Sequence, residues 1–128
     1  MTGESAHKER ATDLGVVRIH NDVIASIAAI AASEIKGVHR LGGGLARNLY
    51  GFFANKCSVK GVRIVSREGD VKLSVSVIVE YGVNIPRVSD EVQENIKLQV
   101  EKMSGLVLSE VNVDVEGVKP PAPAKGGV

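Results

Sequence analysis

The clearest pattern of hydrophobic and polar positions lies between residues 83 and 118, where a helical segment precedes a strand-like one. In the helical segment, apolar residues recur at spacings of four, four, four and three, which places them on one helix face. They are Val88, Val92, Ile96, Val100 and Met103. Pro86 suits the first helical turn and Gly105 suits the C-terminal cap. Residues 111–118 then alternate between apolar and polar side chains, which predicts a half-buried strand.

An earlier stretch predicts a short strand over residues 15–19 and a helix from Asn21 or Asp22 to about residue 35, ended by Gly37. The predicted apolar face of this helix comprises Val23, Ile24, Ile27, Ala28, Ile30, Ala31 and Ile35. Its other side carries the small residues Ala25, Ser26, Ala29 and Ser33. Two interpretations of that side stay open: an exposed helix surface, or a surface that the backbone of another subunit approaches closely.

Residues 59–67 and 71–81 alternate in the manner of strands and are joined by a turn at residues 68–70, which predicts a hairpin. The predicted element order is therefore β-α-β-β-α-β. This order indicates an α+β fold, a two-layer sandwich with both helices on one face of a single sheet. Right-handed crossovers would make the topology ferredoxin-like. A long insert between helix 1 and strand 2, over residues 38–58, leaves the strand order open.

The length of 128 residues predicts one domain with tails. Residues 1–13 are polar and charged, so we expect a disordered N-terminal tail. Residues 14–118 form the predicted domain, and residues 119–128 form a flexible tail rich in proline and glycine. Cys57 is the only cysteine, which excludes an intramolecular disulfide and fits a reducing cytosol. The sequence lacks both the apolar core of a signal peptide and a run of 18 apolar residues.

Charge is unevenly distributed along the chain, although the formal net charge is only +1. Residues 36–67 contain seven bases and no acid, whereas residues 68–118 contain ten acids and four bases. The basic segment also holds three of the four aromatic residues. We therefore predict two partner-binding regions, the basic insert and the acidic face of the second helix. The candidate residues are Arg40, Arg47, Tyr50, Phe52, Phe53, Lys56, Glu91, Glu94 and Glu101.

Candidate catalytic chemistry is sparse. The three histidines are far apart and no His-x-x-x-His or Cys-x-x-Cys spacing occurs, which argues against a zinc site. Cys57 and His39 could in principle form a nucleophile and its base, but a lone cysteine beside an apolar strand is typical of a small core residue. We therefore expect no enzyme activity, no metal and no cofactor.

Nucleic acid is the main alternative partner, because the basic segment 36–67 could meet phosphates. Gly42-Gly43-Gly44 lacks the residues that complete a P-loop or a Rossmann turn, so a hinge is the favoured interpretation. The Gly-x-x-Gly loop of KH modules and the aromatic strands of RNA-recognition motifs are also missing. A small RNA- or phosphate-binding module stays the second hypothesis, and nucleic acid is the less favoured partner.

The stretch from Gly82 onward resembles the alkaline-shock-protein family, the envelope stress response proteins of Gram-positive bacteria. The resemblance rests on Gly82, Ile85-Pro86, Val92-Gln93, Gly105 and Val111-Asn112-Val113. It extends to residues 15–37 and so spans about four-fifths of the chain. It brings no catalytic residues with it.

The resemblance implies a non-enzymatic adaptor or scaffold that supports cell-envelope stress homeostasis. Members of this family are abundant cytoplasmic proteins that gather at the inner face of the membrane, often through a small membrane-anchored partner. We therefore expect self-association into a homo-oligomer and docking to a small membrane-anchored protein. The basic segment could add a weak contact with anionic lipid.

Overall fold

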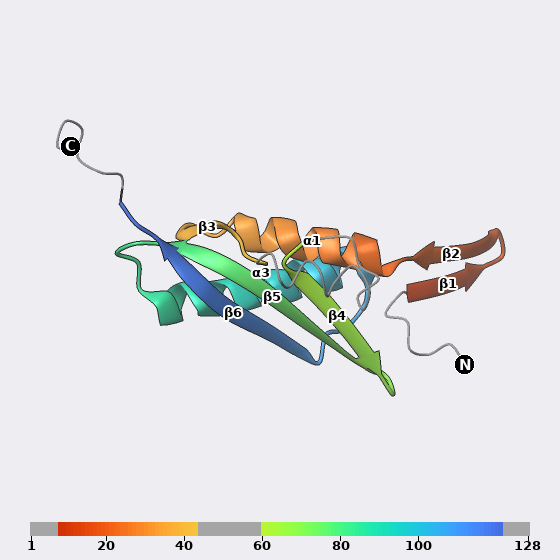
Figure 1. The fold of residues 1–128 in the computed structure, drawn as a ribbon. Coiled ribbons are helices and arrows are strands. Elements are labelled where there is room, and N and C mark those ends of the chain that lie inside the picture. The colour runs from red at the N-terminus through yellow and green to blue at the C-terminus, as the bar shows by residue number, and fades with distance from the viewer. Residues whose placement is uncertain (1–7, 44–59, 122–128) are drawn as a thin grey trace.

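The structure is a computed structural model that describes residues 8–43 and 60–121. The elements in these residues are β1 (Lys8–Thr12), β2 (Gly15–Ile19), α1 (Asn21–Ser33), β3 (Val38–Leu41), β4 (Val62–Arg67), β5 (Asp70–Glu80), α3 (Ile85–Ser104) and β6 (Glu110–Lys119). Helices α1 and α3 lie side by side on one face of a sheet made by β3, β4, β5 and β6 (Figure 1). The predicted α+β fold class and two-layer arrangement are confirmed.

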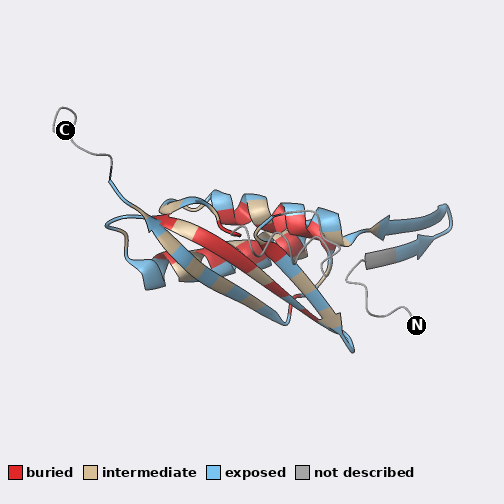
Figure 2. Ribbon diagram, in the orientation of Figure 1, coloured by how far each residue is buried: buried red, intermediate tan, exposed pale blue. Residues whose placement is uncertain are grey.

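Strand β5 is the centre of this sheet. Its first half pairs with β4 and its second half with β3, both antiparallel, while β6 pairs parallel along its other edge. The side chains that β5 turns toward the helices are all buried, and Figure 2 shows them as a red stripe along the strand. They are Val71, Leu73, Val75, Val77 and Val79. The alternation in the sequence therefore predicted the inward face of this strand correctly.

Strands β3 and β4 share one edge of β5, end to end. The Gly42 N–H donates to the Ser76 carbonyl (2.7 Å), and the Ser76 N–H donates to the Gly61 carbonyl (2.9 Å). Because both glycines pair with one residue of β5, the chain leaves the sheet and returns to it at nearly the same point. Strand β3 was not predicted; residues 38–41 were assigned to the insert, and residues 44–59 lie outside the described part of the chain.

Helix α3 begins and ends as its sequence predicts. The Asn84 side chain accepts a hydrogen bond from the Arg87 N–H (3.1 Å), Pro86 sits in the first turn, and Gly105 caps the C-terminus with a φ of 79°. Four of the five residues of the predicted stripe are buried, because their spacing turns them all toward the sheet. The fifth, Met103, is 65% exposed, and Ser104 is buried in its place. The buried positions are spaced by four residues up to the end of the helix, from Val100 to Ser104. The predicted last spacing of three, from Val100 to Met103, was therefore wrong.

Helix α1 packs on the sheet through Ile24, Ala25, Ile27, Ala28, Ala31 and Ala32. The prediction was wrong for three positions of this helix. Ala25 is fully buried, whereas Val23 and Ile30 are exposed. The alanines let the helix axis come close to β5 and α3, and this rotates the buried face toward Ala25 and away from the bulkier side chains. Asn21 and Asp22 lie inside the helix rather than at its cap.

Strands β1 and β2 form a separate two-stranded antiparallel sheet, joined by a two-residue turn at residues 13–14. In Figure 1 this hairpin extends from the start of α1, beyond the end of the main sheet. Two predictions were therefore wrong. Residues 8–12 are a strand rather than part of a disordered tail, and residues 15–19 pair with that strand rather than with the main sheet. A ferredoxin-like topology is not confirmed, because its first strand would lie in the main sheet.

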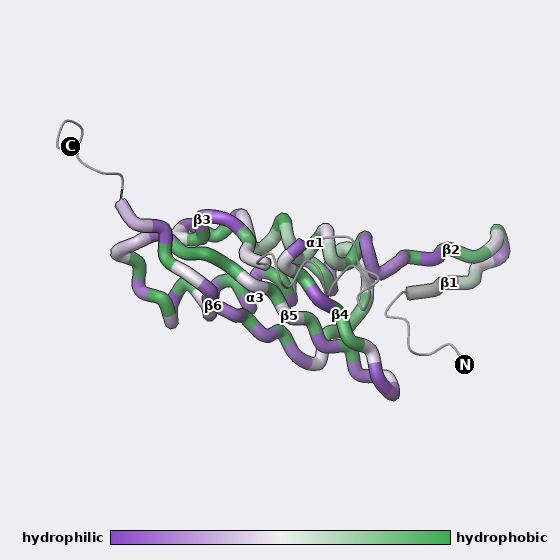
Figure 3. Tube along the Cα trace, in the orientation of Figure 1, coloured by the Kyte–Doolittle hydropathy of each residue, from purple (hydrophilic) through white to green (hydrophobic). Residues whose placement is uncertain are grey.

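The hydrophobic core lies between the two helices and the sheet, as the hydropathy along the trace in Figure 3 shows. The hairpin contributes only Ile19, which is half-buried against this core. The other face of the main sheet is not covered by a described helix (Figure 1). This leaves two exposed surfaces of interest: the open face of the sheet and the projecting hairpin.

Candidate interaction surfaces

Four of the predicted partner-binding residues lie in the described part of the chain: Arg40, Glu91, Glu94 and Glu101. The other predicted residues, Arg47, Tyr50, Phe52, Phe53 and Lys56, lie outside it. The structure does not bring the four described residues into one site. Arg40 is on β3 in the sheet, whereas the three glutamates are on α3.

A basic edge runs along the β3 and β4 side of the open sheet face. Arg40 pairs with Ile78 of β5 and is exposed, with its guanidinium donating to the Leu41 carbonyl (3.1 Å). Arg63 and Arg67 are exposed on β4, where they alternate with inward-facing residues that include the buried Val62. These three arginines define the basic edge. Arg63 and Arg67 were not among the predicted site residues, although the alternation of β4 is visible in the sequence.

An acidic edge lies on the opposite side of β5, along β6. Glu110, Asp114 and Glu116 are exposed and alternate with half-buried residues of the same strand. The Glu110 carboxylate lies 3.5 Å from the Lys72 ammonium of β5. The Glu116 side chain reaches over β5 and accepts a hydrogen bond from the Gly43 N–H (3.2 Å). The charge division of the sequence thus becomes two opposed edges of one sheet face.

The three predicted glutamates of α3 have different surroundings. The Glu91 carboxylate lies 3.4 Å from the Arg87 guanidinium, one helical turn earlier, and Glu94 is exposed. Glu101 points toward β6, where its carboxylate accepts hydrogen bonds from the Lys97 ammonium (2.6 Å) and the Leu108 N–H (3.0 Å). These bonds lower the pKa of Glu101, the one from Lys97 most, against a smaller opposing effect of desolvation. The Glu101 carboxylate therefore holds the turn after α3, while Glu91 and Glu94 face solvent.

Most of the exposed apolar residues were not predicted from the sequence; Leu98 is the one that falls outside the predicted apolar stripe of its helix. On the helical layer they are Val23, Ile30, Ile85, Leu98 and Met103, and on the hairpin they are Leu14, Val16 and Val17. The Asn95 amide donates to the Ala31 carbonyl (2.8 Å), which fixes the sides on which the two helices meet. The apolar run at residues 16–17 looks like a core strand in the sequence. These residues are exposed because β2 pairs only with β1 among the described strands. No sequence pattern within residues 15–19 indicates that pairing.

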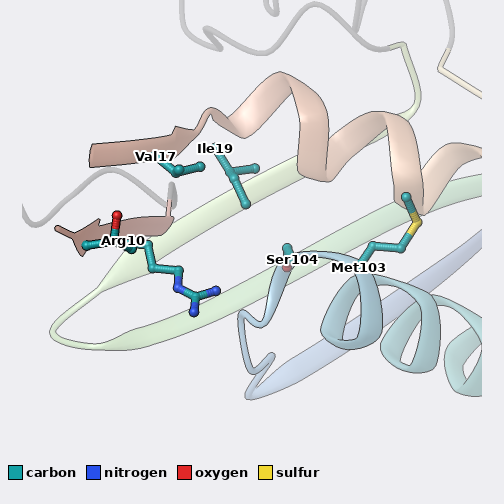
Figure 4. A pocket seen from close by; sticks show the side chains of 6 residues that line it. Arg10, Val17, Ile19, Met103 and Ser104 are labelled. Carbon is teal, nitrogen blue, oxygen red and sulfur yellow. The ribbon is translucent and has the colours of Figure 1, made fainter. Parts of the chain in front are cut away.

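Two grooves border these surfaces. One of about 370 Å³ separates the hairpin from the C-terminal end of α3, with Arg10, Val17 and Ile19 on one side and Met103 and Ser104 on the other (Figure 4). A second, of about 220 Å³, lies between α3 and β6 and is lined by Gln93, Lys97 and Leu108 among others. Both are shallow clefts between elements.

Few groups with metal-binding or catalytic chemistry gather in residues 8–43 and 60–121. No group of three or more His, Cys, Asp or Glu side chains there could hold a metal ion. His39 Nδ1 lies 3.4 Å from a Glu80 carboxylate oxygen, at the end of β3. Cys57, the alternative nucleophile, lies outside the described residues. Neither described helix is long and apolar enough to cross a membrane.

Comparison with known proteins identifies the family. The model of the alkaline shock protein 23 family, which is described as having a cell envelope-related function, matches residues 9–120. The chain belongs to this family. It is 36% identical over 108 residues to the protein YqhY of Bacillus subtilis (strain 168), an alignment that covers 84% of this chain and 80% of YqhY. The resemblance found in the sequence is therefore confirmed.

Two further comparisons give lower sequence identities. A homologue of the stress response regulator gls24 from Streptococcus pyogenes is 27% identical over 106 residues, covering 82% of this chain and 59% of the homologue. Among solved structures, MamM-CTD aligns with a TM-score of 0.49 at 13% identity, covering 78% of this chain and all of that one.

Proposed function

We propose that the protein is a non-enzymatic adaptor of cell-envelope stress homeostasis, which acts by self-association and by docking to a small membrane-anchored protein. The family has a cell envelope-related function, and relatives bear the name of a stress response regulator. The observation that carries the proposal is the division of the open sheet face into a basic edge and an acidic edge. Complementary surfaces of this kind orient partners and raise the rate of encounter.

The proposed location is the cytoplasm, at the inner face of the cell membrane, reached through the partner. Arg40, Arg63 and Arg67 form a strip that can meet an acidic segment of a partner. The same strip could contact anionic lipid at about 1 kcal/mol per basic residue near the surface. A strip of three arginines therefore supports a weak lipid contact, and the protein partner supplies the main attachment.

The test is cross-linking in living cells from a photoreactive residue at Arg63. Ser33, which is exposed on the helical layer, is the matched control position. The proposal predicts a specific adduct from position 63 to a membrane-anchored protein or to a second copy of the chain, absent from position 33. The same diffuse adducts from both positions would contradict it.

A small RNA- or phosphate-binding module is the second candidate, and the basic edge is the observation that favours it. An RNA adduct from position 63 would move this candidate to first place. Charge reversal at Arg40 and Arg63, together with Arg47 and Lys56 of the insert, should then abolish RNA binding. Unchanged affinity of that variant for RNA would exclude the candidate.

A further inference from the structure

The β1–β2 hairpin is exposed to an unusual degree for a regular element. Every side chain from Arg10 to Arg18 is exposed; Leu14 is 97% exposed, and Val16 and Val17 are each 55% exposed. The hairpin pairs with no other strand among the described residues. An isolated two-stranded hairpin is marginally stable in water, and three or more strands are needed for independent stability. Within residues 8–43 and 60–121 the hairpin therefore lacks the third strand that independent stability requires.

The outer edge of β2 is the place where such a partner can add. The two-residue turn pairs Thr12 with Gly15, and hydrogen-bonded and non-hydrogen-bonded pairs alternate from there. Counting along β2, the N–H and C=O groups of Val16 and Arg18 point away from β1. Between them, Val17 turns toward the groove that Met103 borders (Figure 4).

We propose that β2 pairs antiparallel with β2 of a second copy of this chain, about a two-fold axis at Val17. Val16 of each copy then faces Arg18 of the other, and the outward N–H and C=O groups of Val16 gain a backbone partner. The two hairpins become one four-stranded sheet, β1–β2–β2–β1, which has more than the three strands that independent stability requires. This inference specifies the surface for the self-association in the proposed function and rests on it.

The charge pattern of the strands supports a second copy as the occupant. Pairing about Val17 sets valine opposite valine and Val16 opposite Arg18, so no like charges meet. Pairing β1 with itself about its middle residue would set Arg10 opposite Arg10. Strand β6 is longer, but every self-pairing centred between Asn112 and Glu116 sets two carboxylates of the strand opposite each other. Like charges directly opposite are destabilising, so β2 is the self-complementary edge of these three.

The experiment uses two cysteine variants of the full chain, each in a Cys57→Ser background. The proposed axis brings the two Val17 Cα atoms to about 4.5 Å, the spacing of a non-hydrogen-bonded pair. This lies within the range of about 4.4–6.8 Å that a disulfide spans. The two Val16 Cα atoms are offset by two residues along the strand, so they lie about 8 Å apart and beyond bridging. Val16 and Val17 are equally exposed, which makes Val16→Cys a matched control.

Both variants are treated with oxidised glutathione, and their molecular masses are measured under non-reducing conditions. The native mass of the Cys57→Ser chain in solution is measured in parallel. We expect Val17→Cys to shift from one chain to two, Val16→Cys to remain a single chain, and the unsubstituted chain to be a dimer in solution. Equal cross-linking of both variants, cross-linking of Val16→Cys alone, or a monomeric unsubstituted chain would overturn the proposal. A specific adduct from position 63 to a membrane-anchored protein, with no dimer through Val17, would leave the adaptor function standing without this interface.

Discussion

At the scale of single residues, Glu101 shows how one side chain can resemble a binding residue while it serves the fold. It lies among the acids of α3, but its carboxylate bridges Lys97 and the Leu108 backbone, across the turn that leads to β6. The neighbouring Glu94 is exposed and remains suited to contact a partner. Glu94 lies about two turns before Glu101 and lines the groove between α3 and β6, so the distinction depends on position along the helix: Glu101 is next to the turn and Glu94 is not.

Substitution of this carboxylate has a pH-dependent effect that identifies its role. The pKa of Glu101 is lowered in the folded protein, so its contribution to stability is complete above the unfolded value of about 4.3 and is lost as the pH falls through the folded value. Glu101→Gln should therefore lower the free energy of unfolding at pH 7, and the difference from wild type should close as the pH falls through the lowered pKa of Glu101. Urea titrations across this range provide the measurement. Glu94→Gln is the control, and an equal loss from that variant would contradict the assignment.

Burial, rather than hydrophobicity alone, decides what an apolar residue of α3 contributes. Ile96 is fully buried, whereas Leu98, two residues later, is 58% exposed. Ile96→Ala should cost about 2–5 kcal/mol of unfolding free energy, because it removes core contacts and leaves a cavity. Leu98→Ala should change it by no more than about 0.5 kcal/mol. Equal losses in chemical denaturation would show that Leu98 is covered in solution.

At the scale of elements, the junction of β3, β4 and β5 depends on two glycines that let two strands share one edge. Gly61 has a φ of 85°, and a Cβ at this position would lie 3.2 Å from the Gly42 carbonyl oxygen. The close approach of these backbones brings both glycines opposite Ser76, which is itself buried. Strands β3 and β4 therefore follow one another along the same edge of β5, although residues 44–59 separate them in the sequence.

A matched pair of glycine substitutions separates backbone strain from crowding. Gly69, in the β4–β5 turn, has a φ of 87°, and a Cβ there would meet nothing within 4 Å. Gly69→Ala should cost about 1–2 kcal/mol, the strain of a left-handed residue alone. Gly61→Ala should cost more, because strain and the contact with Gly42 add. Thermal or urea unfolding of both variants provides the measurement, and equal losses would mean that the junction widens freely.

At the scale of the whole molecule, the core and the proposed association surface are separate parts. The core lies between α1, α3 and the main sheet, while the hairpin adds only Ile19 to it. The charged edges lie on the open sheet face, away from the helices. Changes to the hairpin or to the charged edges should therefore alter association and leave the fold intact.

Removal of the hairpin tests this separation. A chain that begins at Arg18 lacks β1 and most of β2 but keeps Ile19. It should unfold cooperatively with an m-value close to that of the full chain, since m follows the surface exposed on unfolding. A large drop in m, or loss of cooperativity in urea titrations, would show that the hairpin is part of the folding unit.

The sequence by itself determined the elements whose periodicity and end signals agree. In α3 the apolar spacing, Pro86 and Gly105 all point to one helix, and in β5 a strict alternation fixes the buried face. The alternation of apolar and polar residues in β4 and β6 also indicates which side chains are exposed. Those exposed side chains carry the division of charge. These features are local, because each depends on residues within a few positions of one another.

Only the tertiary structure decided which strands pair and which apolar residues are covered. Residues 15–19 have the composition of a core strand, yet they join β1, and the short β3 takes a place beside β5. Val23, Ile30 and Met103 continue apolar patterns but lie on exposed sides of their helices. Strand pairing joins residues far apart in the chain, and burial depends on the packing partner on each side. Local pattern alone specifies neither of these.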